Sequence, residues 1–228
     1  MGSRLPLEGA VTPHPAGGSF ETGDPISTRE GIPQERIEKG KHNMKKIKLG
    51  PQTFLYPMPA VLVGAKVDLK ANFMTAAWCG IAASNPPAIS VALQKVRHTL
   101  KGINEQGTFS INVPSTSLAR KVDYCGIYSG KKTDKSGLFE IFYGVSQTAP
   151  LVRECPVNLE CKVIHSLDLK SHMLIIGEIL ETYVDESCMT DGKPDPAKID
   201  PLIFTVGVMQ YQRLGGVIGK AFHMGKDK

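Results

Sequence analysis

A run of small residues followed by a tryptophan is the first feature of the sequence that could do chemistry. Thr75, Ala76 and Ala77 are followed directly by Trp78, the single tryptophan of the chain. Small side chains on a strand let a planar ligand approach closely enough to use the backbone N–H and C=O groups. This run therefore favours the binding of a flat heterocycle.

A second group of residues could bind a phosphate. Arg97 and Thr99 lie where a predicted strand passes into a predicted helix, and Ser84 follows the preceding strand. The start of a helix offers unpaired N–H groups and the positive end of its dipole, and arginine adds a forked, permanently charged donor. Together with the small residues, this group indicates a pocket for a flat heterocycle with a phosphate tail.

Several of these residues also have ordinary structural interpretations. Arg97 could be a solvated charge at the end of a strand, and a lone tryptophan such as Trp78 is often a core residue. Cys79 is expected to pack, because nothing nearby plainly lowers its thiol pKa. His172 opens an apolar strand and could either make a structural hydrogen bond or lie at a site of hydride transfer.

The elements that must position these residues are mostly short strands. Apolar runs and alternating patterns predict strands at Ala60 to Val67, Asn72 to Ala82, Ala88 to Leu93, Val157 to Val163, His172 to Val184 and Leu202 to Tyr211. Many short strands with few helices favour a mainly β fold, a closed or nearly closed antiparallel barrel. Because no βαβ alternation is visible, the sequence disfavours a Rossmann domain.

Two helices interrupt the strands. The first is predicted from His98 to Gln106, with Gly107 as its C-terminal stop. The second is predicted to begin at the hydroxyl-rich cluster 114–117, whose side chains could cap it. It would place Val122 and Cys125 on one face.

Composition limits the classes of function. The 228 residues carry a formal net charge of +5, which suits anionic small ligands at least as well as nucleic acid. The aromatic residues are not interleaved with basic ones, which disfavours nucleic-acid binding. Five cysteines without a CxxC pair indicate neither a disulfide framework nor a metal site. No apolar run approaches the roughly 20 residues that cross a bilayer, so we expect a protein of the cytoplasm that does not associate with membranes.

The first 43 residues differ from the rest. They are rich in Gly, Pro, Ser, Thr and charge, and they lack a sustained helix or strand period. This composition predicts a disordered segment. We interpret residues 1–43 as a tag or translated upstream extension, with Met44 as the native start and 44–228 as the folded domain; a native regulatory tail is the alternative.

The order of the motifs resembles the flavin reductase-like, FMN-binding split-barrel family, especially its flavoredoxin branch. The similarity rests on N-x-x-T-A-A-W at 72–78, S-N-P-P at 84–87, R-x-T at 97–99, Thr108 to Pro114, Ser171-His172 leading to Ile176 to Ile179, and Tyr211 to Gly215. It implies an antiparallel, Greek-key type split β-barrel with a few short helices. It further implies a homodimer with FMN near the subunit interface.

The resemblance also implies which residues bind the cofactor. The isoalloxazine and ribityl chain would be lined by Asn72, Thr75, Ala76, Ala77, Trp78 and Cys79, and the phosphate would be held by Ser84, Arg97 and Thr99. Lys135 ends a loop that approaches the phosphate in the family, although a run of lysines is also typical of a solvated loop. Many relatives carry Gly-Asp-His where this chain has Lys170-Ser171-His172, so His172 is retained while its neighbours differ.

The expected function is that of an FMN-dependent oxidoreductase. Flavin supplies the electron chemistry, so the polypeptide needs few acid–base residues. Electrons would come from NAD(P)H or a protein donor and pass to free flavin, iron(III) or another small-molecule or protein partner. Two alternatives stay open, namely a pure electron-transfer flavoprotein and a non-catalytic FMN- or haem-binding module.

Overall fold

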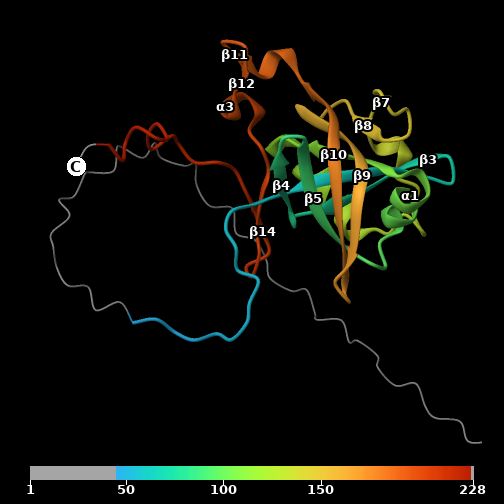
Figure 1. Cartoon of the computed structure of the whole chain (residues 1–228), viewed down its shortest axis with the longest axis horizontal. Helices are drawn as coiled ribbons and strands as arrows, with labels where there is room; N and C mark the ends of the chain where they lie inside the picture. The colour runs from blue at the N-terminus through green and yellow to red at the C-terminus, as the bar shows by residue number, and fades with distance from the viewer. Residues whose placement is uncertain (1–44, 227–228) are drawn as a thin grey trace, which may run out of the picture. The chain divides into compact units, whose positions relative to one another are not determined.

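A computed structural model describes residues 45–226 (Figure 1). The predicted extension 1–43 and the proposed start at Met44 lie outside the described residues. The folded unit begins at Leu49. Within 45–226, no helix combines the length and apolar character needed to span a membrane.

A seven-stranded antiparallel sheet forms the body of this unit, with the order β3-β2-β6-β9-β10-β5-β4. Figure 1 shows β9 and β10 as a long hairpin beside β5. The seven strands are β2 (Val61–Val67), β3 (Lys70–Ala76), β4 (Cys79–Ser84), β5 (Pro87–Gln94), β6 (Thr108–Val113), β9 (Val157–Asp168) and β10 (His172–Val184).

The sheet must be strongly curled, because its two edge strands are consecutive in the chain. Only Ala77 and Trp78 separate β3 from β4. Such a link spans at most about 10 Å, whereas seven strands in a flat sheet would place the two edges about 30 Å apart. Among the described strands, β3 and β4 do not pair with each other. The predicted mainly β split barrel is therefore confirmed, and the barrel is nearly closed rather than closed.

Two hydrophobic clusters explain why β2 and β3 are buried on both faces. The inner cluster takes side chains from six strands of the sheet and from helix α1 (His98–Gln106). The outer cluster lies on the opposite face of β2 and β3 and includes helix α2 (Ala119–Ile127). Representative inner residues are Val63, Met74, Val91 and Ile103, and representative outer residues are Leu62, Phe73, Val122 and Phe139.

Both helices have the predicted positions, but the second is not capped as expected. Gly107 ends α1 in the left-handed conformation, with φ 66°. Val122 and Cys125 are buried, as predicted. A 3-10 turn, η1 (Thr116–Leu118), precedes α2, and neither element receives a side-chain cap. The hydroxyl of Ser115 instead bonds that of Ser117, at 2.6 Å, so the predicted hydroxyl cap is wrong.

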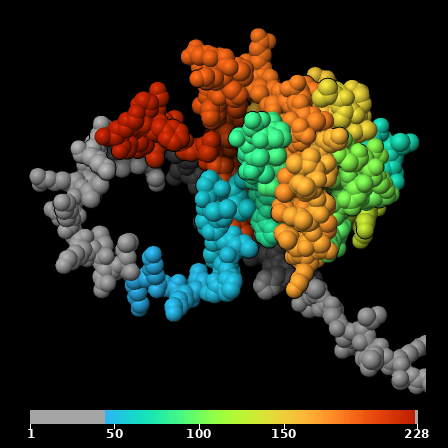
Figure 2. All heavy atoms as spheres, in the orientation of Figure 1, coloured from blue at the N-terminus to red at the C-terminus, as the bar shows by residue number. Residues whose placement is uncertain are grey.

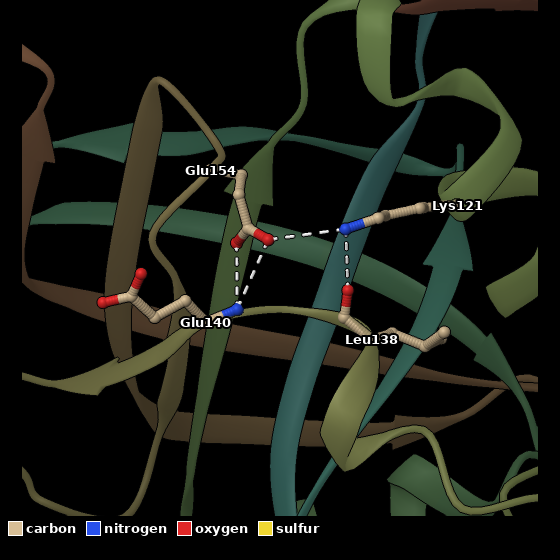
Figure 3. Close-up of polar contacts among 4 residues, drawn as sticks. All are labelled: Lys121, Leu138, Glu140 and Glu154. Atoms are coloured by element: carbon tan, nitrogen blue, oxygen red, sulfur yellow. Dashed lines mark hydrogen bonds and ion pairs between the residues drawn. The ribbon is translucent and has the colours of Figure 1, made fainter.

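A polar cluster holds the segment after η2 (Ser136–Leu138) against α2 (Figure 3). The Lys121 ammonium donates to the Leu138 carbonyl at 2.8 Å and lies 3.5 Å from the Glu154 carboxylate. That carboxylate also accepts from the Glu140 backbone N–H at 3.2 Å. The cluster thereby keeps Phe139 over the outer hydrophobic cluster.

Two predicted strands are each divided in the structure. Asn72 to Ala82 contains most of β3 and most of β4, and Leu202 to Tyr211 contains two strands joined by a turn at Gly207. The latter pair belongs to a three-stranded sheet of β1 (Met58–Pro59), β13 (Ile203–Thr205) and β14 (Gln210–Gln212). The remaining elements are β7 (Ile141–Tyr143), β8 (Pro150–Val152), η3 (Glu186–Cys188), β11 (Met189–Thr190), β12 (Lys193–Pro194) and α3 (Pro196–Ile199).

Candidate functional site

A cavity of about 300 Å³ lies beside the link between β3 and β4. We call it the split cavity. Its walls come from β3 and the link, from the end of β5, and from the three-stranded sheet. Six of the predicted site residues line it, namely Thr75, Ala76, Ala77, Trp78, Arg97 and His172.

Two stacked rings form one wall of the split cavity. The Trp78 and His172 ring centroids are 4.6 Å apart, and the ring planes differ by 30°. His172 opens β10 and pairs with Gln94 at the end of β5. On the other side of β5, the carbonyl oxygen of Trp78 accepts from the Ala92 N–H at 2.9 Å. The Ser171 hydroxyl lies 2.9 Å from His172 Nδ1, which helps to fix the imidazole orientation.

At the split cavity, Arg97 links the start of α1 to the end of α2. It is the residue immediately before α1, and the first turn of that helix receives no side-chain cap. Its guanidinium Nη1 donates to the Gly126 carbonyl in the last turn of α2, at 3.0 Å. A guanidinium beside uncapped helical N–H groups is a suitable donor set for a phosphate.

Thr99 and Asn72 face each other rather than the split cavity. The Asn72 amide Nδ2 donates to Thr99 Oγ1 at 2.7 Å, and both side chains are buried. This hydrogen bond ties the first turn of α1 to β3. Thr75, three residues further along β3 and therefore on its opposite face, donates its hydroxyl proton to the Val122 carbonyl of α2.

Asn72 and Lys135 line a second cavity of about 430 Å³, which also includes the loop 130–135. The Lys135 side chain is buried, and its ammonium donates to the Tyr128 and Cys125 carbonyls at 2.9 and 3.2 Å. Burial lowers the pKa of this ammonium, and the positive charge of Arg97 lowers it further. A charged group held in this way would be stabilised by a nearby anion.

Cys79 and Ser84 lie apart from these cavities. Cys79 opens β4 and packs against the inner hydrophobic cluster, where burial raises the pKa of its thiol to about 12. Ser84 ends the same strand and is exposed. Together with Thr99, they line neither the split cavity nor the second one. The structure therefore brings six of the predicted residues around one cavity and two around its neighbour.

Comparison with known proteins agrees with this architecture. The family model described as the flavin reductase like domain matches residues 53–211. The chain belongs to the flavin reductase-like family.

Two solved structures and a further relative are similar to this chain. A flavoredoxin from Methanosarcina acetivorans is 44% identical, with a TM-score of 0.78 over 80% of this chain and 98% of its own. Flavoredoxin of Desulfovibrio vulgaris (Miyazaki F) is also 44% identical, with a TM-score of 0.74 over 80% of this chain and 100% of its own. A ferric-chelate reductase (NAD(P)H) from Archaeoglobus fulgidus is 28% identical over 48% of this chain and 72% of its own length.

The structure of this flavin reductase-like chain also adds residues that the sequence analysis did not assign to the site. Ala92, Phe204 and Tyr211 line the split cavity. The Tyr211 phenol donates to Asp123 Oδ1 at 3.1 Å, and burial together with this carboxylate raises the pKa of the phenol to about 12. The closing motif at 211–215 was noted in the sequence, but nothing in it indicated that its tyrosine faces the cavity.

Proposed function

We propose that the chain is an FMN-dependent oxidoreductase that takes electrons from NAD(P)H or a protein donor. It would pass them to free flavin, iron(III) or another acceptor. The observation that carries the proposal is the split cavity itself, in which two stacked rings face the same space as Arg97, the residue immediately before α1.

The residues of the split cavity fit FMN in shape and in chemistry. Ala76, Ala77 and Ala92 present methyl groups only, so a flat ring system can approach the backbone. Arg97 and the first turn of α1 would hold the phosphate, and the Thr75 to Trp78 segment would lie along the ring and ribityl chain. Bound FMN would supply hydride and electron transfer, while these residues bind it, orient it and exclude water.

Two observations favour a reductase over a thiol enzyme or a passive carrier. The thiol of Cys79 is held neutral by its raised pKa, so it is a poor nucleophile at neutral pH. His172 lines the split cavity on the wall that Trp78 also forms, where it could position a nicotinamide. The ferric-chelate reductase relative carries NAD(P)H in its name, which supports the same class of donor here.

We also propose a homodimer that works in the cytoplasm. The C-terminal segment, red in Figure 2, exposes Val217, Ile218 and Phe222 by more than 90% each. Contiguous exposed apolar side chains are typical of surfaces that a partner covers. All five cysteines are free thiols, as expected in a reducing compartment. Light scattering on protein lacking 1–43 tests the dimer, and an FMN-loaded monomer would refute it.

The decisive experiment is anaerobic mixing of the FMN-loaded protein with NADH and with NADPH. We expect the flavin to bleach within minutes. We expect His172→Ala to slow this reduction at least about tenfold, equivalent to about 1.4 kcal/mol of barrier. Its FMN affinity should stay nearly unchanged, because the phosphate donors lie on Arg97 and α1.

His165→Ala provides the matched control, since His165 is exposed on the neighbouring strand β9 and lines neither cavity. It should leave the rate unchanged. If neither nucleotide bleaches the flavin, the reductase assignment fails and the electron-carrier alternative replaces it. If His172→Ala instead loses FMN or fails to fold, the histidine has a structural role.

A further inference from the structure

One wall of the split cavity has no part in the proposed function so far. Phe204, Met209 and Tyr211 line the cavity from β13, from β14 and from the turn between them. We call these three residues the third wall. They belong to a sheet whose strands have only two or three residues each, with β14 at its edge. Strands this short are held mainly by what they pack against, so the position of the third wall depends on its contacts with the rest of the chain.

Helix α2 supplies one such contact through Asp123. The Tyr211 phenol donates to Asp123 Oδ1 at 3.1 Å, although the two residues lie 88 positions apart in the sequence. This hydrogen bond joins the edge strand β14 to a helix that packs in the outer hydrophobic cluster. The Tyr211 ring also packs on Phe204, with ring centroids 5.9 Å apart. The side chain of Tyr211 is therefore fixed both at its ring and at its hydroxyl.

The same helix also holds two other residues of the split cavity. Thr75 of β3 donates its hydroxyl proton to the Val122 carbonyl, and Arg97 donates to the Gly126 carbonyl at 3.0 Å. Residues 122–126 of α2 thus bond to cavity residues from three separate elements. Thr75 and Arg97 bond to backbone carbonyls, which remain whatever side chain α2 carries. Among the described side chains of α2, Asp123 alone bonds a residue of the split cavity, so its contribution can be removed by substitution.

The bond between Tyr211 and Asp123 also fixes the protonation of the phenol. Burial, together with the bond to the Asp123 carboxylate and its negative charge, raises the pKa of the Tyr211 phenol to about 12. The phenol is therefore neutral at neutral pH, and its one proton is directed at Asp123. A neutral aromatic ring is suited to packing against a flat heterocycle. Asp123 itself is exposed on α2, so removing its carboxylate opens no hole in the core.

We propose that Asp123 is a positioning residue, which acts through Tyr211 to hold the third wall against the flat ring of the ligand in the split cavity. The inference rests on the proposed function, in which that ring is the isoalloxazine of FMN. It gives the Asp123–Tyr211 pair a part in binding the ring, whereas Arg97 and the first turn of α1 would bind the phosphate. The two parts can be separated by choice of ligand, because riboflavin carries the same ring without the phosphate.

The test compares the dissociation constants of FMN and of riboflavin, measured by the quenching of Trp78 emission. We expect Asp123→Ala to raise both constants by the same factor, about threefold or more, as part of one aromatic contact is lost. Tyr211→Phe should give the same result. The double variant should be no weaker than either single variant, because both substitutions remove the same bond. Asp123→Asn keeps an acceptor oxygen at Oδ1 and should stay within about twofold of the native chain.

Two comparisons separate this positioning role from a general structural one. Glu186→Ala removes an exposed carboxylate of η3 that lines neither cavity, and it should leave both flavin affinities unchanged. A disturbance of α2 as a whole would move the Gly126 carbonyl that holds Arg97, and it would therefore weaken FMN more than riboflavin. In Asp123→Ala the ratio of the two dissociation constants should stay that of the native chain.

Any of four results would overturn the proposal. They are unchanged flavin affinities in Asp123→Ala, losses that add in the double variant, a larger loss for FMN than for riboflavin, and no riboflavin binding by the native chain, which would leave no ring contact to position. The proposed function fails separately. If both flavins bind as expected but neither NADH nor NADPH bleaches bound FMN, the positioning role stands and the reductase assignment is lost. If FMN on the native chain is reduced but Asp123→Ala binds both flavins as tightly as before, the reductase assignment survives and the positioning role is refuted.

Discussion

Replacing Arg97 by alanine tests the phosphate end of the proposed FMN site. The substitution removes the guanidinium that lines the split cavity next to the uncapped first turn of α1. It also removes the 3.0 Å hydrogen bond from Arg97 to the Gly126 carbonyl. The variant therefore affects both cofactor binding and the packing of α1 against α2, and the two effects must be measured separately.

The expected loss of FMN affinity follows from the type of interaction. A hydrogen bond to a charged group contributes about 1.5 to 3 kcal/mol, which corresponds to an increase of about 10- to 150-fold in the dissociation constant. The lost bond to Gly126 joins a cation to a neutral carbonyl at a partly exposed position, so we expect it to lower the free energy of unfolding by only about 1 kcal/mol.

The chain provides its own probe for this measurement. Trp78 is the single tryptophan and lines the split cavity, so the quenching of its emission during FMN titration reports this site alone. Thermal unfolding of the FMN-free variant gives the stability change. Arg153→Ala is the control, because Arg153 pairs with Glu140 on the surface and lines neither cavity. An unchanged dissociation constant in Arg97→Ala would remove Arg97 from the site.

Two further predictions concern packing and thiol chemistry. In Gly102→Ala the added Cβ would lie 2.5 Å from the Lys66 carbonyl oxygen. Denaturant unfolding should therefore show a loss of about 1 to 3 kcal/mol despite a helix-propensity gain of about 1 kcal/mol. Gly126→Ala, with Thr75 Cβ at an ordinary 3.4 Å, is the control, and a stabilised Gly102→Ala would contradict the packing of α1 on β2. Burial raises the Cys79 pKa from 9.0 to about 12, which keeps the thiol protonated and makes thiolate about 1,000-fold rarer at pH 8. Mass spectrometry should show Cys79 alkylated by iodoacetamide at least ~100-fold more slowly in the native than in the unfolded protein, and equal rates would refute its burial.

The sequence predicted α1 and β10 with the bounds that the structure shows, because local signals determine both. Gly107 can adopt the positive φ that ends α1, and β10 begins directly after a turn at Lys170. The break between β3 and β4 has no such signal. Ala77 and Trp78 leave one edge of the sheet and enter the other, and this long-range change does not alter the local pattern of apolar residues.

The sequence could predict only part of the candidate site. Position in the sequence shows which residues lie near the end of an element, but not which way each side chain points. Arg97 precedes α1 in an extended conformation, whereas Thr99 lies in the first turn of the helix, so no single period relates the two side chains. Thr99 turns toward Asn72, while Arg97 faces the split cavity. Ser84 lies six residues beyond Trp78, about 20 Å along an extended strand. Its role in phosphate binding stays a prediction.

The stack of Trp78 on His172 depends on the strand between them. β4 and β10 flank β5 on opposite sides, so rings carried next to these strands can meet only over the face of β5. Ala92 lies on that face and lines the same cavity, with its N–H bonded to the Trp78 carbonyl. Its methyl group leaves the two rings room to approach to 4.6 Å, whereas a longer side chain would stand between them. A single alanine carries no chemical signal in a sequence, yet its small size is a condition for the proposed redox site.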